Sequence, residues 1–163
     1  MKKIASIIYI CFFLASCQTS PDPVRFSEDA LQDVLINRDG DSITFKSILE
    51  KHKGKTILVD VWASWCRDCI VNLPDLKTLQ KEHREVVYLF LSLDKSQNSW
   101  QKGIEKHNII GDHYFMSSGM KGDLGSFLNV DWIPRYMIID ENGLITMFKA
   151  AKVNDPKIKA KFE

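Results

Sequence analysis

The amino-acid sequence has no strong excess of charge of either sign. Its 163 residues include 22 Lys and Arg against 21 Asp and Glu, for a formal net charge of +1. Because nucleic-acid-binding domains present a strongly basic face, this balance argues against a nucleic-acid partner. The sequence also has no apolar run close to the about 20 residues that cross a bilayer, which argues against a polytopic membrane protein. The 45% of hydrophobic residues is typical of a globular domain.

Cysteine is scarce, and two of the four cysteines lie in an N-terminal segment that has the pattern of a targeting signal. Met1-Lys2-Lys3 is followed by a mostly apolar stretch from Ile4 to Ala15, which predicts a secretory signal peptide over residues 1–16. Leu14-Ala15-Ser16-Cys17 resembles the lipobox of bacterial lipoproteins. The resemblance implies cleavage before Cys17 and attachment of lipid to its sulfur. The alternative is an ordinary signal peptide that happens to contain Cys17.

The sequence therefore predicts three segments. Residues 1–16 form the lipoprotein signal peptide, and residues 17–26, which are polar and rich in proline near their middle, form a tether that is anchored to lipid at Cys17. Residues 27–163 form one domain, since no internal repeat and no second linker follow. The protein is then expected outside the cytosol, anchored to a bilayer.

Cys66 and Cys69 form a C-x-x-C pair and are the only thiols in the expected domain. A structural disulfide stabilises most by closing a long loop, and this one would close a very short loop. A zinc site would need two further ligands, but the sequence has no second C-x-x-C and its four histidines show no paired spacing. We therefore expect a redox dithiol, with no metal and no cofactor.

The dithiol lies where a strand pattern gives way to a helix pattern. Thr56 to Val61 is an apolar, β-branched run typical of a buried strand, and apolar residues recur at steps of three from Ile70 to Leu79. Cys66 is thereby placed at a helix N-terminus. Unpaired backbone N–H groups and the positive end of the helix dipole there favour a thiolate over a thiol.

Four separate stretches resemble the thioredoxin-like proteins. Leu58 to Cys69 resembles the active-site strand and loop of that family, and Pro74 matches the proline of its active-site helix. Ile133-Pro134 resembles the family's cis-proline loop. Phe90 to Asp94, followed by Trp100, is similar to the extracytoplasmic TlpA/ResA-type branch. The resemblance implies an α/β, thioredoxin-like fold, in which helices flank a central mixed β-sheet with a short N-terminal β-extension.

The residue pattern predicts the same order of elements. Val86 to Leu93 is a second long apolar strand, and Trp100 to Asn108 is an amphipathic helix. Asn142-Gly143 is a strong hairpin signal between strand-like runs at Arg135–Asp140 and Leu144–Lys149. Two smaller signals predict a turn at Asn37–Asp41 in the N-terminal extension and a last helix that begins at Asp155-Pro156.

The cysteines and one acidic residue have expected roles in the reaction. Cys66 is the expected nucleophile and the more exposed thiol, and Cys69 is the resolving thiol that releases the mixed disulfide. Asp60 interrupts an apolar strand; if it is buried, its pKa is raised and it could exchange a proton with Cys69. The alternative for Asp60 is an acid that caps a turn at the end of the strand.

The resemblance also implies a substrate-binding region beside the dithiol. Pro134 in cis would place the backbone of its neighbour Ile133 next to the cysteines, where a substrate strand could bind. Trp65 and Trp132 could belong to the core or to an apolar rim that binds a partner. Ile133 makes this loop more apolar than in many relatives, which carry a small or β-branched polar residue there.

The resulting hypothesis is a lipid-anchored thiol–disulfide oxidoreductase of the bacterial cell envelope, facing the periplasm. The resemblance implies reduction of protein disulfides, for example in apocytochromes, and an upstream membrane thiol reductant; oxidation and isomerisation are open to the same residues. A peroxiredoxin is a second candidate, although neither Pro nor Thr of its P-x-x-x-T-x-x-C motif precedes Cys66. A metal-delivery or binding module of the same fold is a third, although copper-delivery relatives carry C-x-x-x-C.

Overall fold

The computed structural model describes residues 21–162. The predicted signal peptide and Cys17 lie outside the described residues. The elements, in chain order, are α1 (Glu28–Gln32), β1 (Val34–Ile36), β2 (Ser42–Thr44), α2 (Phe45–Lys51), β3 (Ile57–Trp62), α3 (Arg67–Glu82), β4 (Val87–Ser92), α4 (Gln97–His107), β5 (Asp112–Phe115), the 3₁₀ turn η1 (Gly119–Lys121), α5 (Asp123–Phe127), β6 (Arg135–Ile139), β7 (Ile145–Ala150) and α6 (Pro156–Lys159).

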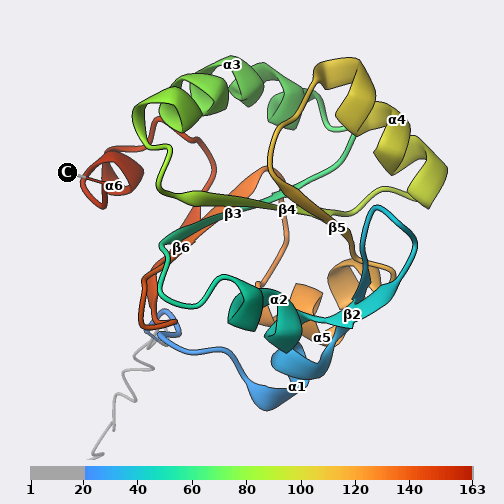
Figure 1. Ribbon diagram of the computed structural model, residues 1–163, viewed down its shortest axis with the longest axis horizontal. Helices are drawn as coiled ribbons and strands as arrows, with labels where there is room; N and C mark the ends of the chain where they lie inside the picture. The colour runs from blue at the N-terminus through green and yellow to red at the C-terminus, as the bar shows by residue number, and fades with distance from the viewer. Residues whose placement is uncertain (1–20, 163) are drawn as a thin grey trace, which may run out of the picture.

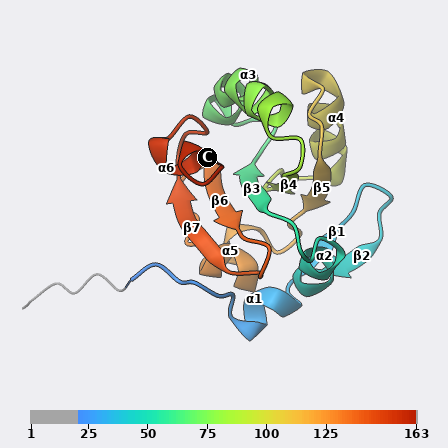
Figure 2. The ribbon, with the colours of Figure 1, turned by 60° about the vertical axis from the view of Figure 1, so that its left-hand side comes forward.

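One mixed sheet of seven strands forms the centre, in the order β2-β1-β5-β4-β3-β6-β7. β3, β4 and β5 are parallel to one another, whereas β6 pairs antiparallel with β3 and then with β7. α3 and α4 cover one face of the sheet, and α1, α2 and α5 lie on the other (Figure 1; Figure 2 shows the same layers from the side). The predicted fold class is therefore confirmed: a mixed sheet between two layers of helices, with the short strands β1 and β2 as an N-terminal extension.

The neighbouring strands β3 and β6 are buried from end to end because helices cover both faces of this part of the sheet. Every residue of β3 and β6 is buried, and the apolar runs that the sequence predicted as strands make up much of the core. The hairpin of β6 and β7 turns at Asn142-Gly143 as predicted, and Gly143 has a φ of +78°, which favours glycine.

Two elements differ from the sequence prediction, and one contact involves a residue that precedes the expected domain. α4 begins at Gln97, three residues before the predicted start, because the Ser96 side chain caps it by accepting the Ser99 N–H at 3.2 Å. β5 was not predicted, since its sequence has no strand pattern. Phe26, the last residue of the expected tether, packs its ring 5.0 Å from the ring of Phe45.

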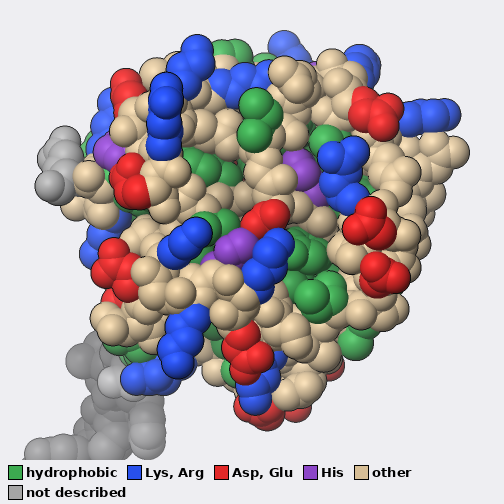
Figure 3. Space-filling view, in the orientation of Figure 1, with side chains coloured by type: hydrophobic (Ala, Val, Ile, Leu, Met, Phe, Trp, Pro, Cys, Tyr) green, Lys and Arg blue, Asp and Glu red, His purple; other side chains and the backbone are tan. Residues whose placement is uncertain are grey.

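No helix in the described range 21–162 is long and apolar enough to span a bilayer. On the face in Figure 3, lysine and arginine side chains are interspersed with aspartate and glutamate, so this face carries both signs of charge.

Candidate active site

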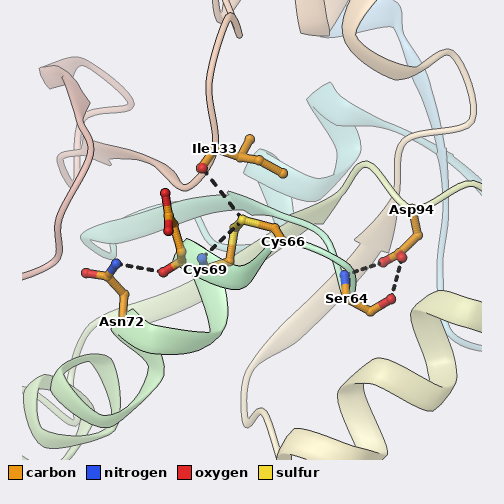
Figure 4. Close-up of a disulfide and its surroundings, with 7 residues drawn as sticks. Ser64, Cys66, Cys69, Asn72, Asp94 and Ile133 are labelled. Atoms are coloured by element: carbon orange, nitrogen blue, oxygen red, sulfur yellow. Dashed lines mark hydrogen bonds between the residues drawn. A yellow bond between two sulfur atoms is a disulfide. The ribbon is translucent and has the colours of Figure 1, made fainter.

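The two cysteines lie at the start of α3, directly after the loop that follows β3. They form a disulfide with a Cα–Cα distance of 5.3 Å (Figure 4). Cys66 is the N-cap of α3, and its sulfur accepts the backbone N–H of Cys69 at 3.1 Å. In the reduced protein this donor and the helix dipole would both stabilise a thiolate at Cys66. The predicted place of the dithiol at a strand-to-helix junction is thus confirmed.

Both sulfur-bearing side chains are almost covered. Cys66 is 6% exposed and Cys69 is 3% exposed, so exposure alone hardly separates the two thiols. What separates them is that Cys66 borders a surface pocket and Cys69 does not. Of the two cysteines, Cys66 is thus the one that lines the pocket.

The loop before β6 contacts the dithiol from the other side. The Ile133–Pro134 peptide bond is cis, and the carbonyl oxygen of Ile133 lies 3.6 Å from the Cys66 sulfur. Ile133 is buried, whereas its neighbour Trp132 is exposed. The predicted juxtaposition of this loop and the dithiol is present in the structure.

A buried arginine, Arg135, anchors the loop that contains Ile133 and Pro134. Arg135, 6% exposed, donates to the carbonyl oxygens of Leu128 at 3.3 Å and Asn129 at 2.7 Å. It also pairs with the exposed carboxylate of Asp131 at 2.7 Å. These contacts fix the chain on both sides of Trp132. Sequence reasoning missed Arg135, because a charge at the start of an apolar strand has no local signature of such contacts.

An apolar pocket of about 380 Å³ opens beside Cys66. Three large side chains around it are strongly exposed: Trp65 at 59%, Trp132 at 65% and Met120 at 51%. Contiguous exposed apolar surface of this kind marks an interaction site on a small domain. Met120, which comes from η1, was not predicted; only the tertiary fold brings it to the dithiol.

Asp60 lies in the layer between β3 and α3. The hydroxyl of Tyr88 donates to the Leu79 carbonyl of α3 at 3.1 Å, so Tyr88 points to that face of the sheet. In the parallel pairing of β3 with β4, Leu58 lies beside Tyr88, and Asp60 lies beside Phe90, two residues further along β4. Because side chains alternate along a strand, Asp60 also points toward α3, the helix that carries Cys69.

Burial changes the acidity of Asp60. The residue is 3% exposed, and its Oδ1 has no hydrogen-bond partner within residues 21–162. This desolvation raises the pKa of Asp60 from 3.8 to about 8, because a charge in the core is costly. Tyr136, its register partner on β6, has its own pKa raised by burial and by the nearby charge of Asp60. The carboxyl can thus hold a proton at neutral pH.

Asp94, two residues after the end of β4, binds the loop that leads to the dithiol. Its Oδ2 accepts the Ser64 backbone N–H at 3.0 Å and its Oδ1 accepts the Ser64 hydroxyl at 2.6 Å (Figure 4). Ser92 completes the network by donating its hydroxyl to Oδ2 at 2.9 Å. Asp94 ends the stretch Phe90 to Asp94 that resembles the TlpA/ResA-type branch, but its contact with Ser64 has no signal in the sequence.

Charged groups beside the pocket are few. Arg67 and Asp68, between the two cysteines, are both exposed at the pocket, as is Asp131. Across the described part of the chain, no three side chains of His, Cys, Asp or Glu are grouped so that they could hold a metal ion.

A dithiol at a helix N-terminus, faced by a cis-proline loop on a mixed sheet, defines a class of redox-capable α/β domain. The family model described as thioredoxin-like matches residues 54–145, and the chain belongs to this family. It is 31% identical to "Thioredoxin-like protein YneN" of Bacillus subtilis over 61% of this chain and 59% of that protein. It is 35% identical to "Thiol:disulfide interchange protein DsbE" of Yersinia pestis over 63% of this chain and 52% of that protein.

Solved structures agree on the fold. The solution structure of a Bacteroides vulgatus protein, proposed to be a thiol-disulfide oxidoreductase, superposes with a TM-score of 0.68 and 28% identity. The superposition covers 83% of this chain and 87% of that one. The chain spans between half and three fifths of the length of the two curated relatives above.

Proposed function

We propose that this chain is a thiol–disulfide oxidoreductase of the bacterial cell envelope that reduces protein disulfides through a mixed disulfide. One observation carries the proposal: Cys66 caps α3, receives the Cys69 N–H on its sulfur and borders an open apolar pocket. The names of the relatives, which describe thiol:disulfide interchange and thioredoxin-like proteins, support the same chemistry.

The reaction follows from the order of the two thiols. In the reduced protein, the Cys66 thiolate attacks one sulfur of a substrate disulfide, and the other substrate sulfur leaves as a thiolate that takes up a proton. Cys69 loses its proton and attacks Cys66 in the mixed disulfide. The second substrate thiol is released, and the protein keeps the Cys66–Cys69 disulfide. Two electrons thus pass from the dithiol to the substrate.

Asp60 is proposed to take the proton of Cys69 in the second step, in the fraction of molecules in which its carboxyl has already lost its own proton. It lies in the layer between β3 and α3, and burial raises its pKa to about 8, close to that of a thiol. A base whose pKa lies near that of the acid can accept and return the proton. The carboxyl would then lose the proton again when the dithiol is regenerated.

The substrate is proposed to bind over the pocket, in contact with Trp65, Trp132 and the backbone of Ile133. The two exposed tryptophans support an apolar polypeptide segment as the ligand. The carbonyl of Ile133 contacts the Cys66 sulfur, so a strand bound along this loop would bring its own sulfur next to Cys66.

The location and the reductant belong to the proposal as well. The signal-like N-terminus and the lipobox-like sequence at Cys17 support a lipid-anchored protein that faces the periplasm. A membrane thiol reductant would then reduce the disulfide after each turnover, and apocytochromes are among the candidate substrates. Incorporation of labelled palmitate that is lost in Cys17→Ser tests the anchor.

Two single variants test the activity. With dithiothreitol as the reductant, we expect wild type to reduce insulin disulfides and Cys66→Ser to lose this activity. Cys69→Ser should instead accumulate mixed disulfides with substrate proteins, because the resolving thiol is gone. The control is Val71→Ser, which places a serine at an exposed position of α3 outside the pocket. Reduction by Cys66→Ser at the wild-type rate would show that the proposed nucleophile is wrong.

A further inference from the structure

The loop between β3 and α3 is a tight turn closed by one backbone bond. The N–H of Cys66 donates to the carbonyl oxygen of Ala63 at 3.0 Å. Ser64 and Trp65 are the two central residues of this turn, and they point in different directions: Ser64 contacts Asp94 in the interior, whereas Trp65 is 59% exposed. The position of Cys66 therefore depends on how firmly Ser64 is held.

Ser64 donates two hydrogen bonds to the carboxylate of Asp94, and this carboxylate is itself held in place. The side chain of Asp94 is 5% exposed, and Ser92, fully buried, donates to the same carboxylate. The backbone N–H of Asp94 in turn donates to the Ser92 hydroxyl at 3.1 Å. Hydrogen bonds to a carboxylate are among the stronger ones in proteins, and a buried network with every member bonded is rigid.

The backbone of α4 confines Ser64 from a second direction. A Cβ added at Gly103 would overlap the Cβ of Ser64 and would lie 3.4 Å from its Cα. Neither atom can rotate away, because both move only with the backbone of the turn. Ser64 is therefore held between the carboxylate of Asp94 and the close approach of α4.

We infer that Asp94 is a positioning residue for the dithiol, which acts through Ser64 to keep the Cys66 sulfur at the N-cap of α3. The inference rests on the proposed function, since it concerns the reactivity of the same thiol. Asp94 does not border the pocket, so it would not touch the substrate. The stabilisation of a charge by a helix terminus falls off within the first turn, so a small shift of the sulfur weakens it.

The experiment measures the reactivity of Cys66 in the reduced, full-length protein. Iodoacetamide alkylation is followed at the Cys66 peptide by mass spectrometry across a range of pH. For Asp94→Asn we expect a higher apparent pKa of the Cys66 thiol and an alkylation rate at pH 7 about two to five times lower, the size of a helix-terminus effect on one charge. The charged groups at the pocket, Arg67, Asp68 and Asp131, are the same in every variant. Loss of the Asp94 charge alone would lower the pKa of the Cys66 thiol, so a rise reports the displacement of the sulfur.

Ser64→Ala provides a second, milder variant. It removes the hydroxyl bond but leaves the Ser64 backbone N–H on Asp94, so its alkylation rate should lie between wild type and Asp94→Asn. Asp140→Asn is the matched control. The Asp140 carboxylate also accepts backbone N–H groups, from Asn142 at 3.0 Å and Leu144 at 2.8 Å. Asp140 directly follows β6 beside the first residue of β3, whereas the dithiol follows the last residue of β3. We expect Asp140→Asn to leave the pH profile of Cys66 unchanged.

The outcomes separate this inference from the proposed function. An unchanged Cys66 pH profile in both Asp94→Asn and Ser64→Ala, with any loss confined to the unfolding midpoint, would overturn the positioning role. If wild type fails to exchange disulfides while Asp94→Asn still shifts the Cys66 profile, the proposed function is wrong and the positioning role stands.

Discussion

Gly103 of α4 lies against Ser64 of the active-site turn so closely that a side chain at position 103 would overlap the Ser64 Cβ. Gly103 is in the interior of a helix, where glycine is normally unfavourable relative to alanine. The contact with Ser64 gives a physical reason for glycine here. It joins the second helix of this layer to the turn that presents Cys66.

Gly103→Ala is therefore expected to harm the protein, although alanine is the better helix former. On an exposed helix the substitution would stabilise by about 0.5–1 kcal/mol. Here the added Cβ must displace the backbone of Ser64 or of α4, and such overpacking typically costs about 1–3 kcal/mol. We expect a lower urea midpoint, together with slower alkylation of Cys66 in the reduced protein.

Lys102→Ala is the control for Gly103→Ala. It changes the neighbouring, exposed position of the same helix, and within residues 21–162 the Lys102 side chain forms no hydrogen bond with the turn. It should unfold at nearly the wild-type urea concentration and keep the wild-type Cys66 reactivity. A stabilised Gly103→Ala protein would contradict the close packing at Ser64.

Asp60 predicts how stability depends on pH. Its pKa is about 8 in the folded protein and 3.8 when fully solvated, so between these values the folded state binds a proton that the unfolded chain has lost. The free energy of unfolding therefore falls as pH rises through this window, by up to about 1.4 kcal/mol per pH unit from this group, and levels off above it. Below about pH 4, Asp60 is protonated in both the folded and the unfolded state, and the stabilisation that depends on its protonation is fully present.

Asp60→Asn removes this proton equilibrium. The free energy of unfolding of the disulfide form is measured in urea at pH 5 and at pH 8. From pH 5 to pH 8, this free energy should fall by about 2–4 kcal/mol less in the variant than in wild type. Asp39→Asn, on the exposed turn between β1 and β2, is the matched substitution of a carboxylate in water. Parallel pH profiles of Asp60→Asn and wild type would mean that Asp60 is not a buried, protonated acid.

The sequence predicted the elements whose signal is local. The strands β3 and β4 are continuous apolar runs, the buried face of α3 repeats at helical spacing, and Asn142-Gly143 marks the hairpin. β5 escaped prediction because Asp112 and His113 interrupt any apolar pattern. Its place in the sheet comes from pairing with β4, which is a tertiary contact.

The same division applies to the site. Cys66 and Cys69 could be predicted because their spacing and their place before a helix lie within a few residues. Asp94 and Ser64 are 30 residues apart and Met120 is more distant still, so only the fold brings them to the dithiol. A serine in a loop or a methionine in a polar stretch carries no signal of its own.

Arg135 is expected to stabilise the loop of Ile133 from beneath. Arg135→Met keeps much of the apolar stem but leaves the carbonyls of Leu128 and Asn129 without their donor, and a buried group without its bond costs about 1–3 kcal/mol. Urea unfolding should show a loss of this size. Asp131→Ala removes only the exposed partner of Arg135, and its midpoint should stay close to wild type. Equal losses in the two variants would contradict this assignment.

Met120 is expected to contribute to substrate binding without affecting the chemistry of the thiol. It lies on the pocket beside Cys66 and is 51% exposed, so Met120→Ser removes apolar contact area and leaves the α3 N-terminus unchanged. Burying a large apolar side chain contributes about 1.5–3 kcal/mol, and a partly buried methionine should contribute about half of that. We therefore expect KM for a protein disulfide substrate to rise about threefold to tenfold, with Cys66 alkylation unchanged.

Val71→Ser is the control, because it makes the same kind of apolar-to-serine change on α3 outside the pocket, at a side chain that is 65% exposed. It should leave KM unchanged. If KM rose as much for Val71→Ser as for Met120→Ser, the effect would come from any loss of exposed apolar side chain and not from this pocket.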